Sequence, residues 1–288
     1  MKKLTVLLLA LALLISGFAL MAERATAADI TLGYSNWACA EAKTYTVRAA
    51  IEKELGLEVE TMMAEPAPVY SGIASGDLDA MIASWLPVTH QDYIEQYGDQ
   101  MHKSGLSYSG ARIGLVVPEY VDIDSIEELN EHADKFDNRI IGIDPGAGIM
   151  QATNEAIPHY DLELDLIEGS GPAMTASLSD AIENEEWIVI TGWEPHWKFA
   201  RFDLKFLEDP DRIYGEIENV YSWSRTDLSN DYPEAANLIF DFYMSSEQLG
   251  EVMGWISDGM EPVEAGRKWV EENEDIVEQW SSPVYSSY

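Results

Sequence analysis

The sequence predicts an α/β protein made of two similar lobes with a ligand cleft between them. A strand-helix-strand-helix-strand order over 29–83 recurs between 139 and 191. This order is typical of a mostly parallel sheet flanked by helices. Tryptophans and a glycine-rich turn follow predicted strands in both halves. Because ligands of open α/β sheets bind beyond the carboxyl ends of strands, these residues indicate one site formed by both lobes.

The first 27 residues have the composition of a secretory signal peptide. Lys2 and Lys3 precede an apolar run over 4–21, and Ala25-Thr26-Ala27 offers the small residues that a signal peptidase requires. We therefore expect cleavage after Ala27 and a soluble periplasmic protein, with an uncleaved membrane anchor as the alternative. No cysteine lies near the cleavage point, so no lipid anchor is expected.

The charge of the chain is strongly negative. Asp and Glu number 52 against 17 Lys and Arg, which gives a formal net charge of −35. This balance argues against nucleic acid and anionic membrane surfaces as partners. The hydrophobic content of 47% argues against disorder. Two explanations of the negative charge remain, an acidic channel for cations and a surface adapted to high salt. Because the acidic residues are spread over the whole chain, we favour high salt.

In the first half, strands are predicted over 29–34, 57–63 and 79–83, and helices over 38–55 and 69–74. Gly56 and Gly76 follow the two helices, as is common at helix C-termini.

The stretch 83–90 contains Trp85 and His90 on either side of Pro87. Proline disfavours a helix or a central strand, so we expect an ordered loop that presents both side chains to the cleft. An aromatic face attracts a cation, and an imidazole can hold an anion.

A short helix over 93–98, a strand over 112–117 and an acidic helix over 126–133 connect the two halves. In the second half, strands are predicted over 139–144, 187–191 and 220–224, and helices over 149–156 and 174–184. From Pro233 to Trp280 the pattern is helical, with breaks near Gly259 and Pro262.

Three tryptophans at strand ends, Trp37, Trp85 and Trp193, are candidates for an aromatic cage. A trimethylammonium group has no N–H to donate, so it is held by aromatic faces at ~0.5–2 kcal/mol each. Core packing is the alternative for any tryptophan. We expect core packing for the tryptophans inside helix or strand patterns, which are Trp187, Trp255, Trp269 and Trp280. The roles of Trp197 and Trp223 remain open.

Donors for a carboxylate are predicted at a glycine-rich turn and at His90. The turn Asp144-Pro-Gly-Ala-Gly148 opens into a helix, whose first N–H groups and dipole favour an anion. It resembles a phosphate loop only weakly, because it lacks the Lys and Ser/Thr of that motif. His90 could instead be a satisfied core or surface histidine. His196 is expected behind Trp193, away from the ligand.

Three segments, 83–90, 142–150 and 191–197, resemble the signature segments of the glycine betaine/proline betaine-binding proteins of ABC importers. The resemblance implies a two-lobe periplasmic binding protein of type II, with 28–116 and 225–288 in lobe 1 and 117–224 in lobe 2. Binding would close the lobes, and the closed form would dock on a membrane permease.

The resemblance also implies roles for individual residues. The aromatic prism would be Trp37, Trp85 and Trp193. The carboxylate would be held by the main-chain N–H groups of Gly148 and Ile149 and by the His90 side chain. Relatives often carry an Asp-Ser-Glu run after the first tryptophan, whereas this chain has Ala38-Cys39-Ala40-Glu41. The wall near Trp37 therefore differs from that of those relatives.

We expect a monomeric receptor that captures glycine betaine or proline betaine for an ABC importer in osmoprotection, with no catalytic residue, cofactor or metal. A choline or carnitine receptor and a sensor subunit are alternatives within the class. A secreted hydrolase using Cys39 is the alternative from another class. Cys39 is the only cysteine, and a buried apolar role is the simpler interpretation.

Adaptation to high salt makes a testable prediction. Salt screens the repulsion among acidic side chains, so the melting temperature should rise between low salt and molar salt. Thermal unfolding followed by circular dichroism at both salt concentrations measures this difference, and equal melting temperatures would contradict the hypothesis.

Overall fold

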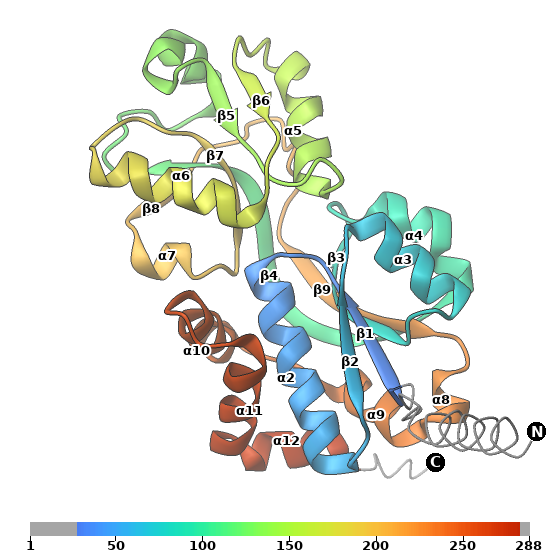
Figure 1. Ribbon diagram of the computed structural model, residues 1–288. Helices are drawn as coiled ribbons and strands as arrows, with labels where there is room; N and C mark the ends of the chain where they lie inside the picture. Colours follow the sequence, from blue (N-terminus) through green and yellow to red (C-terminus); the bar gives the residue numbers. More distant parts are fainter. Residues whose placement is uncertain (1–27, 283–288) are drawn as a thin grey trace, which may run out of the picture.

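The long strand β4 (Met101–Pro118) runs through both lobes of the computed structural model, which describes residues 28–282 (Figure 1). Its first part, to Ala111, pairs with β9 (Glu218–Arg225), and its second part, from Arg112, pairs with β7 (Ile190–Glu194). The expected signal peptide over 1–27 lies outside the described residues. Within those residues, no helix has both the length and the apolar character needed to cross a bilayer.

The sheet of lobe 1 has the strand order β2-β1-β3-β9-β4. The first three strands are parallel, and β9 is antiparallel to both β3 and β4. The remaining elements of this part are β1 (Ile30–Tyr34), α2 (Ala38–Leu55), β2 (Val59–Met63), α3 (Pro66–Ser75), β3 (Ala80–Leu86), α4 (Gln91–Tyr97) and the 3-10 turn η1 (Gly98–Gln100).

The sheet of lobe 2 has the order β4-β7-β5-β6, with β8 paired to the end of β4. Strands β7, β5 and β6 are parallel, and β4 is antiparallel to β7. The other elements are the 3-10 segment η2 (Ile126–Phe136), β5 (Arg139–Ile141), α5 (Gly148–His159), β6 (Asp165–Ile167), α6 (Gly171–Glu183), α7 (Lys198–Arg201) and β8 (Leu204–Phe206).

Five helices follow β9 along the chain. Helix α11 packs along α2, and α12 packs against α9 (Figure 1). Their bounds are α8 (Leu228–Asp231), α9 (Pro233–Asp241), α10 (Ser246–Ser257), α11 (Pro262–Glu272) and α12 (Glu274–Ser281). We propose the division expected from the sequence, with 28–116 and 225–288 in lobe 1 and 117–224 in lobe 2, because β4 and β9 lie at its two boundaries and the last helices pack on α2. The pairing of β9 with β3 and β4 adds 218–224 to the sheet of lobe 1.

The structure departs from the expected elements mainly in lobe 2 and in β4. Strands β6 and β8 were not predicted, and β4 begins at Met101 instead of residue 112. Two glycines and three register shifts lie between Met101 and Ala111, so the alternation typical of a strand is interrupted there. Strand β7 is displaced toward Glu194 from its expected position.

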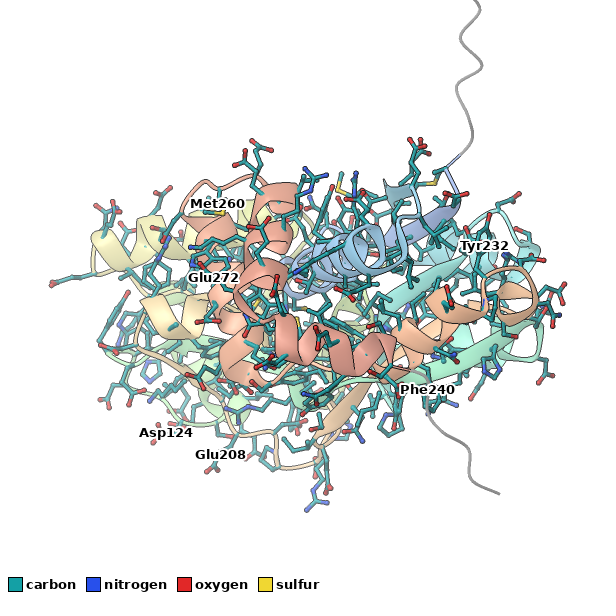
Figure 2. All side chains as sticks on the ribbon, turned by 90° about the horizontal axis from the view of Figure 1, so that it is seen from below. Asp124, Glu208, Tyr232, Phe240, Met260 and Glu272 are labelled. Atoms are coloured by element: carbon teal, nitrogen blue, oxygen red, sulfur yellow. The ribbon has the colours of Figure 1, made fainter. Side chains whose placement is uncertain are left out.

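The four tryptophans that the sequence placed inside helix or strand patterns lie in or against the core, as expected, although Trp187 precedes β7. The rings of Trp269 and Trp280 stack at 5.6 Å, and Trp187 and Trp255 are partly buried against the core. Trp223, left open by the sequence, is buried in a separate apolar cluster beneath α3. In contrast to these buried tryptophans, the acidic side chains of Asp124, Glu208 and Glu272 are exposed at the surface (Figure 2).

Gly266 lets α11 lie close to α2. A Cβ atom at this position would come within 2.3 Å of the carbonyl oxygen of Tyr45. We expect Gly266→Ala to lower the free energy of unfolding by about 1–3 kcal/mol, because the two helices must separate. Urea unfolding measures the change.

Gly250 provides a matched control in α10, where an added Cβ would meet nothing within 4 Å. Gly250→Ala should leave stability unchanged or raise it by about 0.5–1 kcal/mol, because alanine favours the helix. Equal effects of the two substitutions would contradict the packing argument.

Candidate ligand-binding site

A cavity with about 320 Å³ of empty space, open solvent included, lies between the lobes. It is bordered by all six residues that the sequence singled out, Trp37, Trp85, His90, Gly148, Ile149 and Trp193, together with Cys39, Thr89, Ile113, Ile143 and Ala147. No acidic side chain is among these described lining residues. The sequence therefore predicted which residues come together, although they come from four separate regions of the chain.

Each tryptophan of the cavity is placed by the end of a regular element. Trp37 immediately precedes α2, Trp85 pairs with Val220 in the sheet of lobe 1, and Trp193 pairs with Ile113 in the sheet of lobe 2. All three are buried, with at most 8% of their surface exposed. The three indole rings therefore border the cavity from both lobes with little exposure to solvent.

The sequence predicted a loop over the whole segment 83–90, but only its second half is a turn. Strand β3 continues through Trp85 to Leu86, and the turn begins only at Pro87. Pro87 lies just beyond the paired residues, so its missing N–H interrupts no ladder hydrogen bond. The strand thus fixes Trp85, and the turn that follows carries His90 back toward it.

Glu218 holds that turn and was missed by the sequence reasoning. Its buried carboxylate accepts hydrogen bonds from the N–H groups of Val88 and Thr89 at 2.8 and 2.9 Å, and from the Thr89 hydroxyl. A single acidic residue among 52 gave no sequence signal, because its partners lie about 130 residues earlier.

His90 is fixed as a neutral hydrogen-bond donor. Its Nδ1 atom accepts from the Trp85 N–H at 2.9 Å, so the ring hydrogen is on Nε2. Nε2 is buried and has no protein partner among residues 28–282. Burial, with a smaller effect of nearby Lys43, lowers the pKa of His90 to about 3. The side chain therefore carries an unused N–H at neutral pH.

The N-terminus of α5 supplies two further donors. The N–H groups of Gly148 and Ile149 have no backbone or side-chain acceptor in the described part of the chain. They lie at the positive end of the helix dipole. A Cβ at Gly148 would come within 1.8 Å of the Thr89 carbonyl oxygen, so only glycine permits this approach of the two lobes.

Two hydrogen bonds link the lobes beside the cavity. The Trp37 indole Nε1 donates to the Asp144 carboxylate at 2.9 Å, and the Tyr93 hydroxyl donates to the Gly146 carbonyl at 2.8 Å. The sequence included Asp144 in the glycine-rich turn but gave its side chain no role. This bond orients Trp37 relative to the opposite lobe.

The surroundings of Trp193 include His196 and Lys198. The His196 ring packs edge-on against Trp193 at 4.9 Å, and the Lys198 Nζ lies 4.2 Å from the centroid of the indole. Neither residue borders the cavity, and Trp197 does not border it either.

Cys39 borders the cavity as a free, buried thiol. Burial raises its pKa, which lowers the fraction of nucleophilic thiolate. No histidine is hydrogen-bonded to it within the described residues, and no group of His, Cys, Asp and Glu there is placed to hold a metal ion. The arrangement does not support the hydrolase alternative.

Residues 28–272 match the family described as the substrate binding domain of ABC-type glycine betaine transport systems. The chain belongs to this family. Residues 28–272 therefore form a substrate-binding domain of the kind found in ABC-type glycine betaine transport systems, which is the family that the signature segments had predicted.

The chain is similar to the glycine betaine/carnitine transport binding protein GbuC of Listeria monocytogenes, with 40% identity over 182 residues. The match covers 62% of this chain but only 59% of that relative, so it spans less than two thirds of the relative's length.

Solved structures confirm the predicted two-lobe fold. Lactococcal OpuAC in its closed conformation with glycine betaine is 36% identical, with a TM-score of 0.83 over 88% of this chain and 99% of the other. ProX of Borrelia burgdorferi is also 36% identical, with a TM-score of 0.85 over 88% and 97%. A choline-binding protein in complex with choline is 25% identical, with a TM-score of 0.80 over 87% and 90%.

The buried His90 makes a prediction about acid stability. Its pKa is about 3 in the folded protein and 6.5 ordinarily, so the unfolded chain binds the proton between these values. The contribution to stability is complete above pH 6.5 and is lost as the pH falls toward 3.

Urea unfolding from pH 7 to pH 4 measures the free energy of unfolding of the wild type and of His90→Gln. Both proteins share the same carboxylates, so the difference between the two pH profiles isolates the effect of His90. The wild type should lose more stability than the variant, by up to about 3 kcal/mol. Parallel curves would show that His90 is not buried as a neutral base.

Proposed function

We propose that the cavity binds glycine betaine, or a close betaine such as proline betaine, and that the protein delivers it to the permease of an ABC importer. The observation that carries this proposal is the cavity's combination of three indole rings with unused N–H donors and no acidic side chain among its described lining residues. A cation without N–H groups is held by aromatic faces, and the donors suit a carboxylate.

In the proposed complex, Trp37, Trp85 and Trp193 surround the trimethylammonium group. The carboxylate accepts from the N–H groups of Gly148 and Ile149 and from His90 Nε2. Three cation–π contacts contribute roughly 2–6 kcal/mol in total, and charged hydrogen bonds ~1.5–3 kcal/mol each. After the cost of association, an affinity in the micromolar range, near about −8 kcal/mol, is expected.

Choline is the runner-up, and the donors argue against it. Choline carries the same cation but no carboxylate, so the N–H groups of Gly148, Ile149 and His90 would be left without a charged acceptor. Each unpaired buried donor costs about 1–3 kcal/mol. Carnitine has a carboxylate but needs more room than glycine betaine. A titration series with glycine betaine, proline betaine, choline and carnitine ranks them directly.

Family membership and the sequence support the biological setting that we propose. We infer that the mature protein acts in the periplasm as a monomer, and that closure of the lobes on the ligand creates the surface recognised by the permease. The site binds and releases its ligand unchanged. The acidic surface supports a role in osmoprotection at high salt.

Trp85→Ala should weaken glycine betaine binding at least tenfold, measured by calorimetry, because one wall of the aromatic cage is lost. Trp255→Ala is the matched control, since Trp255 packs against the core away from the cavity. It should leave the affinity unchanged. Equal affinities of Trp85→Ala and wild type would remove Trp85 from the ligand site.

A further inference from the structure

Lys198 is a buried cation in contact with a wall of the cavity. It is the first residue of α7, and none of its surface is exposed. Its Nζ lies 4.2 Å from the centroid of the Trp193 ring and 3.4 Å from the Trp193 carbonyl oxygen. Because Lys198 does not border the cavity, its ammonium group contacts Trp193 from outside the space that the ligand would occupy.

No carboxylate forms an ion pair with this ammonium group in the described chain. Glu194 on β7 is the nearby acid, but it pairs with Arg112 at 3.0 Å. The other titratable groups around Lys198 are Cys39 on α2 and His196 in the β7–α7 connection. Burial raises the pKa of the Cys39 thiol and lowers that of His196, so both are uncharged at neutral pH.

A buried ammonium without a counter-ion is easily deprotonated, because burial disfavours its charged form. Burial lowers the pKa of Lys198 to about 7, although Cys39 and Glu194 act in the opposite direction. Lys43 is also buried, with a pKa lowered to about 8, but its Nζ donates to the Ser107 hydroxyl at 3.1 Å and contacts no ring of the cavity. Lys198 is therefore the group near Trp193 whose charge changes close to neutral pH.

The charged ammonium of Lys198 and a bound quaternary amine would both interact with the Trp193 ring, and each weakens the interaction of the other. A cation on one side of an aromatic ring weakens the negative potential that a second cation would use. The two positive charges also repel strongly, because little water screens them in this interior. The ligand and the proton on Lys198 consequently compete.

We propose that Lys198 couples ligand binding to the release of a proton. The uncharged amine of Lys198 favours the quaternary amine in the cavity, and the proton passes to solvent when the lobes open and close. By linkage, a proton that weakens ligand binding is itself bound less tightly in the complex. Affinity should therefore rise as the pH rises through neutrality. The inference rests on the proposed function.

Calorimetry with glycine betaine from pH 6 to pH 9 tests the coupling. In the wild type, the dissociation constant should fall by roughly three- to tenfold across this range, the size expected of a site-to-site coupling. Repeating each titration near pH 7 in buffers with different ionisation enthalpies counts the protons released, and a clear fraction of one proton per ligand is expected.

Lys198→Met removes the charge and keeps a long apolar side chain. At pH 6 it should bind as tightly as the wild type does at pH 9, with no pH dependence and no proton release. Lys268→Met is the matched control, because the Lys268 Nζ lies 3.8 Å from the Trp255 ring, away from the cavity. This control should keep the pH dependence of the wild type.

Three results would overturn the inference. The first is a wild type with the same affinity at all pH values and no proton release. The second is a Lys198→Met variant whose dissociation constant exceeds that of the wild type by the same factor at every pH. Lys198 would then only hold Trp193 in position, without coupling its proton to the ligand. The third is a pH dependence lost in Lys43→Met but kept in Lys198→Met. Wild-type proton release tests the coupling even if a variant fails to fold. Absence of betaine binding at every pH would instead contradict the proposed function.

Discussion

The aromatic surface of the cavity is divided between the two lobes, and the rest of the site depends on that division. Trp37 and Trp85 come from one lobe and Trp193 from the other, so no lobe alone can surround a cation. The hydrogen bond from Trp37 to Asp144 ties the first lobe's indole to the second lobe's turn. In the proposed complex, ligand binding and lobe closure are consequently one event, in which the ligand stabilises the state that completes its own site.

The cavity differs in charge from the molecule that surrounds it. The chain has 52 acidic residues, yet the described lining residues include none of them. The nearest carboxylates, Asp144 and Glu218, lie behind the lining residues, where they accept hydrogen bonds from Trp37 and Thr89. Burial lowers the pKa of the two bases near the cavity, His90 and Lys198. Neutral bases leave N–H donors available without adding a positive charge that would repel a cationic ligand. The acidic side chains of the chain thus lie outside the cavity lining, whereas the cavity itself combines aromatic faces with N–H dipoles.

Sequence reasoning predicted the residues whose chemistry is local and missed those whose role depends on distant partners. Trp85, Pro87 and His90 lie close in sequence, and Gly148 opens a helix, so both features could be recognised from the order of residues. Glu218 and Lys198 are ordinary charged residues until the fold brings them to the turn and to Trp193. The early part of β4 was missed because glycines and register shifts obscure its alternation.

Gly148 is the position where ligand binding and closure impose the same requirement. In the proposed complex, the helix N-terminus presents its N–H groups to the carboxylate, which favours a residue without a side chain. The Thr89 carbonyl of the opposite lobe also approaches this residue so closely that any Cβ would clash with it. Glu218 fixes the turn that carries Thr89, so the same contact that brings the lobes together is supported by the sheet of lobe 1. A side chain at Gly148 would therefore hold the lobes apart before it touched a ligand.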